Sequence, residues 1–128
     1  MFEQDSDGVL RSALLSRLPW VVHGFGTRLS ERWPGDYTSA KQIHSDAVVM
    51  AKKGQGCQQS GDALIASEAE SLIGVRTADC VPLLIADPKR KVIAAVHAGW
   101  RGTVAGITAR TIERLSVEYK TNPNECVA

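Results

Sequence analysis

Short apolar runs, each closed off by glycine, proline or charged residues, mark the middle of the chain. Their lengths and the turn residues beside them are typical of buried strands. The pattern predicts strands at residues 63–66, 72–75, 81–86 and 92–96. Weaker β-like segments are expected at residues 20–25, at Ile43 and at residues 47–50.

After Gly102, apolar residues recur at spacings of three and four, which is the pattern of an amphipathic helix. The positions that carry this pattern are Val104, Ile107, Thr111, Leu115 and Tyr119. Thr103 is expected to cap the start of the helix, and the pair Asn122-Pro123 is expected to end it.

The order of these elements favours an α+β fold. Residues 87–90 form a turn that is too short for a parallel crossover, so the runs at 81–86 and 91–96 should pair as antiparallel strands. Several strands then precede one long helix, which is unlike a doubly wound sheet. Residues 10–18 form a short amphipathic segment, and residues 28–40 mix proline, glycine and charge as a loop does.

Composition and charge narrow the classes of partner. A chain of 128 residues with 44% hydrophobic residues suits a single domain, residues 1–128. The net charge of +1, with both signs interspersed, offers no broad patch for nucleic acid or for a membrane surface. The acidic start of the chain is unlike a signal peptide, and the three cysteines make no disulfide framework, so a cytoplasmic location is expected.

Two motifs place reactive side chains at the ends of predicted strands. V-R-T-A-D-C ends with Cys80, and V-H-A-G-W-R-G carries His97. If the two neighbouring strands pair, Cys80 and His97 meet at one end of a sheet. Upstream, K-Q-I-H-S-D supplies His44 as a third donor. Two histidines and one cysteine on separate elements suit a tetrahedral zinc whose fourth position stays open.

Two acidic residues near these donors could support them. Asp79 and Asp62 either orient a ligating imidazole and move a proton, as catalytic groups, or are ordinary turn carboxylates at strand ends. Cys80 and His97 are also catalytic candidates, because a cysteine within reach of a histidine can act as a nucleophile.

Cationic and polar residues point to an anionic substrate. Arg101 stands between two glycines at the predicted helix start, where exposed amides and a guanidinium together make an anion site. Arg76 and Arg28 either complete a phosphate clamp or are surface arginines. Gln42, next to the His44 motif, is also expected to contact substrate or phosphate. Trp100 either stacks on a base or packs against the helix.

Longer motifs occur in a fixed order along the chain. They are H-G-F-G-T-R, K-Q-I-H-S-D, G-D-A-L-I-A, R-T-A-D-C-V-P-L-L-I-A-D and A-A-V-H-A-G-W-R-G. In this order they resemble the laccase-domain (YfiH-like) family, whose members are named polyphenol oxidases, purine nucleoside phosphorylases or peptidoglycan editing factors. The resemblance implies zinc ligands at His44, Cys80 and His97. It also implies two β-sheets with flanking helices, similar to a cysteine-hydrolase architecture.

The same resemblance implies a zinc-dependent purine nucleoside phosphorylase that acts on adenosine, inosine and methylthioadenosine, with adenosine deamination as a second activity. Its partners would be small molecules, a purine nucleoside and phosphate. Three alternatives stay open: a Cys-His hydrolase or deamidase that edits a peptidoglycan precursor, a copper polyphenol oxidase, and a non-catalytic zinc-binding domain. Copper suits three nitrogen and sulfur ligands, but the chain has no histidine-rich multicopper pattern.

The chain departs from the family's pattern in two places. The loop between Arg28 and Lys41 is short and lacks an Asn-Arg segment, and residues 124–128 resemble the start of a strand. We therefore expect the chain to be the N-terminal, zinc-ligand-bearing part of the domain, incomplete at its C-terminus. An uncovered strand edge would favour a homo-oligomer.

Overall fold

The structure, a computed structural model, describes residues 1–31 and 33–128 and belongs to the predicted α+β class. Its strands are β1 (Phe2–Gln4), β2 (Leu10–Ser12), β3 (Ser39–Lys41), β4 (Val48–Met50), β5 (Cys57–Ser60), β6 (Ala63–Ala66), β7 (Val81–Asp87) and β8 (Val92–Ala98). Its helices are α1 (Trp100–Ala105) and α2 (Ile107–Tyr119), with short 3-10 turns at Leu15–Arg17 and Pro123–Glu125. Within the described residues the strands form three sheets rather than the two expected.

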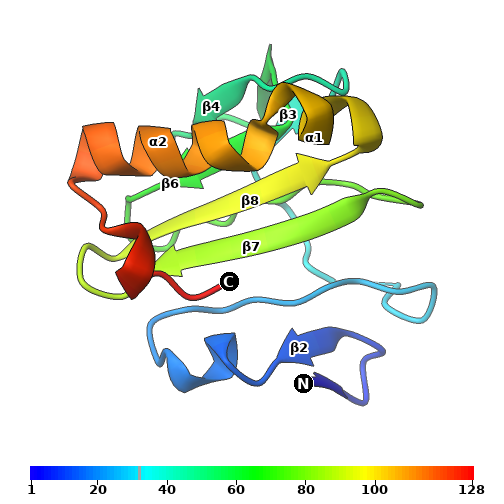
Figure 1. The fold of residues 1–128 in the computed structure, drawn as a ribbon. Helices are drawn as coiled ribbons and strands as arrows, with labels where there is room; N and C mark the ends of the chain where they lie inside the picture. Colours follow the sequence, from blue (N-terminus) through cyan, green and yellow to red (C-terminus); the bar gives the residue numbers. More distant parts are fainter. Residues whose placement is uncertain (32) are drawn as a thin grey trace.

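The central sheet has the strand order β4-β6-β8-β7 (Figure 1). β7 and β8 pair as antiparallel strands along their full length, from Val81 opposite Ala98 to Asp87 opposite Val92, which confirms the predicted hairpin. Asp87 is fully buried and accepts the amides of Lys89 and Arg90, so the carboxylate fixes the turn between the strands. The hairpin therefore brings the start of β7 and the end of β8 to the same end of the sheet.

Both helices cover one face of this sheet (Figure 1). Ile107 and Leu115 of α2 pack with Ile65, Ile85 and Val96 of the sheet in one buried cluster. The single helix predicted after Gly102 was wrong in two respects: the helical run begins earlier, with Gly99 as the cap in place of Thr103, and Gly106 divides it. Gly106 has a φ of +84°, a conformation that glycine adopts without steric cost. None of the described helices is long and apolar enough to cross a membrane.

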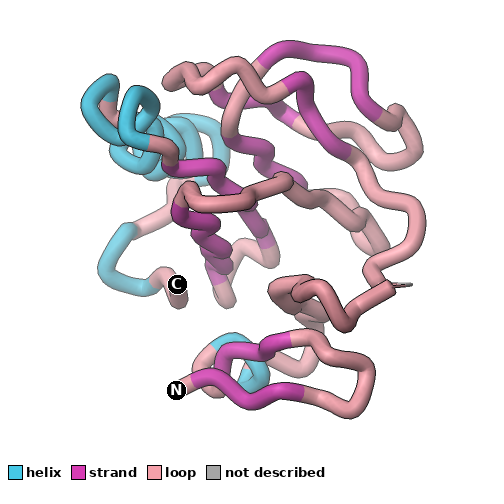
Figure 2. Tube along the Cα trace, turned by 90° about the vertical axis from the view of Figure 1, so that its right-hand side faces the viewer, coloured by secondary structure: helices cyan, strands magenta, loops and turns pink. Residues whose placement is uncertain are grey.

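The opposite face of the sheet borders a cavity of about 470 Å³. Residues 21–26 and 71–77 line its other sides, and the β1-β2 hairpin lies beyond residues 21–26 (Figure 2). His23 belongs to this region, where its Nε2 accepts the amide of Ser12 at 2.9 Å. Burial, aided by the charge of Arg11, lowers the pKa of His23, so this histidine is a neutral structural group.

Some predicted elements differ from those observed. The apolar segments at 20–25 and 72–75 are irregular, and their backbone pairing is limited to single bridges at Phe25 and Ile73, although Ile73 and Val75 pack against the sheets. Ile43 also lies outside any strand. The predicted loop at 28–40 ends within β3, and its Arg32 is outside the described residues.

At the other end of the chain, the strand expected at 124–128 is reduced to a two-bond pairing of Val127 with Ala86. β5 went unrecognised because the residues of this edge strand are polar and mostly exposed, so they lack the apolar pattern of a buried strand.

Truncating the core side of α2 should destabilise the whole fold. Leu115 is 1% exposed against the sheet, so Leu115→Ala should lower the free energy of unfolding by about 2–5 kcal/mol. Val117 on the same helix is 62% exposed, and Val117→Ala should change it by less than about 0.5 kcal/mol. Urea denaturation followed by circular dichroism measures both. Equal effects of the two changes would contradict the packing described here.

Candidate metal centre

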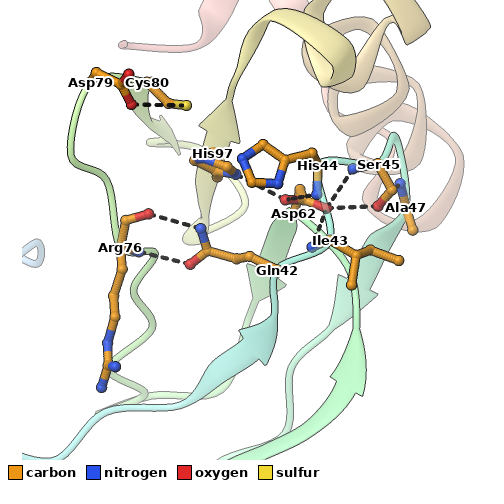
Figure 3. Close-up of polar contacts among 10 residues, drawn as sticks. All are labelled: Gln42, Ile43, His44, Ser45, Ala47, Asp62, Arg76, Asp79, Cys80 and His97. Atoms are coloured by element: carbon orange, nitrogen blue, oxygen red, sulfur yellow. Dashed lines mark hydrogen bonds and ion pairs between the residues drawn. The ribbon is translucent and has the colours of Figure 1, made fainter.

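His44, Cys80 and His97 converge at one end of the central sheet (Figure 3). One donor atom from each lies within 4.8 Å of the other two. His97 is buried near the end of β8, Cys80 is half-buried just before β7, and His44 is exposed in the turn after β3. The two imidazole rings meet edge to face with centroids 5.1 Å apart.

Asp62 holds the two histidines in place. Its side chain is fully buried at the start of β6, and its Oδ1 contacts Nδ1 of His97 at 2.8 Å. The backbone amides of Ile43, His44 and Ser45 donate to the same carboxylate, as does the Ser45 hydroxyl. One carboxylate therefore fixes both the His44 turn and the His97 ring.

These hydrogen bonds explain an unusual backbone conformation at His44. Its φ of +59° lies in the left-handed region, which costs a residue with a side chain about 1–2 kcal/mol. The strain is tolerated because the turn directs three successive amides at one carboxylate. The result is that the imidazole of His44 is held toward His97 (Figure 3).

The charge state of Asp62 sets the tautomer of His97. Burial raises the pKa of Asp62, but hydrogen bonds from Ser45, His97 and Ile43 outweigh burial and hold the pKa below its usual value. An ionised Asp62 can only accept, so Nδ1 of His97 carries the proton. The lone pair of Nε2 is then free to bind a ligand.

The space between the three donors suits a small ion. A Cβ atom added at Gly99 would lie 3.1 Å from Sγ of Cys80, 3.2 Å from His44 and 3.8 Å from His97. Any larger residue would thus crowd the donors. One thiolate and two imidazoles form a donor set that suits zinc. The donor atoms lie within 4.8 Å of one another and would have to draw together by about 1 Å to reach the ~3.5 Å set by tetrahedral zinc bonds. The residues present therefore fit a metal ion.

The other predicted site residues differ in how close they lie to this cluster. Asp79 is exposed beside Cys80, with its Oδ1 3.9 Å from the sulfur. Arg101 is exposed in the first turn of α1, and its guanidinium lies 5.2 Å from the ring centre of Trp100. Trp100 itself is 72% exposed, so it does not pack against the helix. Arg28 is exposed in a loop, and no contact within the described residues joins it to the cluster.

Arg76 and Gln42 contact each other. Both polar atoms of the Gln42 side chain bond to the backbone of Arg76, and the Arg76 guanidinium bonds to the Tyr37 hydroxyl at 3.0 Å. The guanidinium extends away from the two histidines (Figure 3). Arg76 also lines the cavity beneath the sheet, with Pro82, whereas His44, Cys80 and His97 do not.

One residue that matters here was not identified from the sequence, namely Ser45, which donates twice to Asp62. Gly99, one of the small residues expected after His97 to let a ligand approach, does leave room for the donors. Ser45 follows His44 directly, but its partner is 17 residues away, so nothing local reveals the contact. Gly99 follows His97 by two residues, and a small residue beside a candidate ligand is the only available signal.

The chain resembles known proteins in both sequence and fold. The chain is 45% identical over 80 residues to a purine nucleoside phosphorylase of Deinococcus radiodurans, covering 62% of this chain and 31% of that protein. It is 44% identical over 54 residues to an adenosine deaminase of an unknown prokaryotic organism, covering 42% of this chain and 21% of that one. The crystal structure of the hypothetical protein YfiH of Bacillus licheniformis matches with a TM-score of 0.67 at 27% identity.

The structural match covers 71% of this chain and 38% of YfiH, so the chain spans about a third of the length of such relatives. The model of one protein family matches residues 27–128, which include every residue of the cluster. The chain thus belongs to the family described as multi-copper polyphenol oxidoreductase laccase.

Proposed function

We propose that this chain carries the metal centre of a zinc-dependent purine nucleoside phosphorylase. The observation that carries the proposal is the convergence of His44, Cys80 and His97, with Asp62 behind the histidines. The purine nucleoside phosphorylase and adenosine deaminase names of its relatives supply the substrate class. The substrates are adenosine, inosine and methylthioadenosine, with adenosine deamination as the second activity.

The donor set favours zinc over copper. The chain has three histidines in all, and His23 is committed to the backbone of Ser12, which leaves two imidazoles for metal. The chain shows no histidine-rich pattern of a multicopper site. Zinc bound by three protein groups supplies a Lewis acid with an open position, which suits the activation of water in deamination.

In phosphorolysis an oxygen of phosphate forms a bond to C1′ of the ribose, and the glycosidic C–N bond breaks. The base leaves with the electron pair of that bond and takes up a proton, and the sugar keeps the phosphate. Arg101, with Arg76 and Arg28 as further candidates, would hold the phosphate against the sugar. Asp62 keeps His97 in one orientation and one tautomer throughout.

A hydrolase with Cys80 as its nucleophile is the second candidate. The arrangement Asp62, His97 and Cys80 places a carboxylate behind a histidine that faces a thiol, which is the order of groups in a Cys-His catalytic site. In this alternative His97 takes the thiol proton and the sulfur attacks an amide carbonyl. The C–N bond breaks as His97 returns the proton to the leaving amine, and water then hydrolyses the thioester to give the acid and restore the thiol. A peptidoglycan precursor would be the substrate.

One pair of measurements separates the candidates. Elemental analysis of the purified protein gives its metal, and mass spectrometry gives the products formed from nucleosides with phosphate and from a peptidoglycan precursor. Bound zinc with sugar 1-phosphate as a product supports the proposal. Amide hydrolysis that survives removal of the metal supports the hydrolase, and bound zinc without turnover supports a binding domain.

Each predicted ligand should be required for zinc. His44→Ala and Cys80→Ser should each weaken zinc binding by more than the ~10–100-fold that loss of an outer-shell partner causes, and should lower the melting temperature of the zinc-loaded protein. Competition with a chromophoric chelator measures the affinity. Cys57→Ser, which changes an exposed thiol on β5, is the matched control and should bind like the wild type. Full zinc binding by Cys80→Ser would show that the ligand set is wrong.

Asp62 should matter for both the fold and the metal. Asp62→Asn replaces one accepting oxygen with a donor that faces other donors, so the free energy of unfolding of the metal-free protein should fall by about 2–4 kcal/mol. Zinc affinity should fall by about 10–100-fold. Urea denaturation and chelator competition give the two quantities. The exposed Asp36 offers a control, because Asp36→Asn should leave both unchanged.

Arg101 should serve phosphate rather than the base. Arg101→Ala should raise the KM for phosphate by about tenfold, equivalent to ~1.4 kcal/mol, while deamination of adenosine is spared. Steady-state kinetics of the two reactions on one preparation make the comparison. Arg17→Ala, on a distant exposed turn, should alter neither. If Arg101→Ala slows both reactions equally, Arg101 binds the nucleoside or supports the fold.

A further inference from the structure

The side chain of Gln42 bonds to the backbone of Arg76 in the way that a neighbouring strand would. Its Nε2 donates to the carbonyl of Arg76 at 2.8 Å, and its Oε1 accepts the amide of Arg76 at 2.8 Å (Figure 3). The two hydrogen bonds close a ring between segments 34 residues apart. Each polar atom of the side chain thereby makes a hydrogen bond within the protein.

This ring continues a short backbone pairing. Thr38 donates its amide to Leu72 at 2.8 Å and accepts the amide of Gly74 at 3.1 Å, as neighbouring parallel strands do. Past Thr38, no further backbone hydrogen bond joins the two segments within the described residues. The side chain of Gln42 bridges the gap and adds one more pair of hydrogen bonds, at Arg76.

The bridge lies at the start of the loop that carries Cys80. Within the described part of the chain, Arg76 is the only residue between Gly74 and Val81 whose hydrogen bonds reach another segment, namely Gln42 and Tyr37. Residues 76–79 are exposed, and regular pairing resumes with β7. Without Gln42, the hydrogen bonds that hold the near end of the loop would be that of the Arg76 side chain to Tyr37 and the pairing of Thr38 with Leu72 and Gly74.

Each pair of the three donors is thus joined by one link. Asp62 joins His44 to His97, and the β7-β8 pairing, in which Pro82 lies opposite His97, joins Cys80 to His97. The link between His44 and Cys80 runs through Gln42, which precedes His44 by two residues.

We propose that Gln42 is a positioning residue of the metal centre. It holds the Cys80 loop against the His44 turn, so that the thiolate and the imidazoles converge before a metal arrives. This inference rests on the proposed metal-binding function and assigns to Gln42 a role that needs no direct contact with the metal. Loss of the two Gln42 hydrogen bonds should weaken the bond of a metal ion to Cys80 more than its bonds to the histidines.

Gln42→Met tests this role in the full chain, because methionine has a similar length but neither donates nor accepts strongly. The probe is Co²⁺, whose near-ultraviolet absorption reports a bond to thiolate and whose visible absorption reports the overall geometry. Gln42→Met should bind Co²⁺ about 10–100-fold more weakly and should show a reduced thiolate band. Gln42→Glu, which keeps an acceptor for the Arg76 amide but loses the donor, should fall between the wild type and Gln42→Met.

Two controls separate positioning from general loss of stability. Ile112→Ala weakens the packing of α2 far from the bridge and should leave the thiolate band intact at an equal or larger loss of unfolding free energy. Gln59→Met changes an exposed glutamine on β5 and should behave as the wild type. In the metal-free protein, hydrogen exchange of residues 76–80 should be faster in Gln42→Met than in either control.

The possible results distinguish this inference from the proposal beneath it. A wild-type thiolate band and affinity in Gln42→Met, even with faster exchange of the loop, would overturn the role of Gln42 and leave the metal centre standing. An equal loss of the band in Ile112→Ala would likewise reduce Gln42 to a structural residue. A wild-type protein with no thiolate band, or one whose band survives Cys80→Ser, would overturn both.

Discussion

A single buried carboxylate controls the geometry of this site. Asp62 has no access to water, so its charge must be balanced by donors within the protein. Those donors come from the turn at residues 43–45 and from His97, which lie on different elements. The carboxylate therefore has all of its hydrogen-bond donors only when the turn and the imidazole are in place together. The left-handed conformation of His44 and the tautomer of His97 both follow from this requirement.

The central sheet and its helices hold Asp62 and His97 rigidly in this arrangement. β6 carries Asp62 and pairs with β8, which carries His97, so the carboxylate and imidazole move as one unit. The helices protect this unit on one face of the sheet, through Ile107 and Leu115. Because the three donors belong to segments that are distant in sequence, a metal bound by all of them would bind only the folded chain. Metal binding and folding are then coupled.

The sequence predicted the parts that depend on local pattern. The strands at 63–66, 81–86 and 92–96 were identified because buried strands leave compact apolar runs, and their hairpin followed from the short turn. The segment 20–25 looked similar but is irregular, because it packs against a cavity rather than into a sheet. The convergence of His97 and Cys80 was likewise predictable from strand ends. The sequence offered Asp62 as a group that could orient an imidazole, but it did not show which one. The partners of Asp62, Ser45 and Gln42 lie 17 to 35 residues away, which no local pattern encodes.

The position of His44 bears on the choice between a metal centre and a cysteine nucleophile. The pair of Asp62 and His97 would serve either chemistry, since it orients an imidazole toward Cys80 in both cases. A nucleophilic cysteine needs only one such base. Here a second imidazole is held 5.1 Å from the first, in a backbone conformation that costs free energy and is offset by hydrogen bonds to Asp62. The role of a third metal donor accounts for this strained histidine, whereas the base of a nucleophilic cysteine is already supplied by His97, so the position of His44 favours the proposed metal centre.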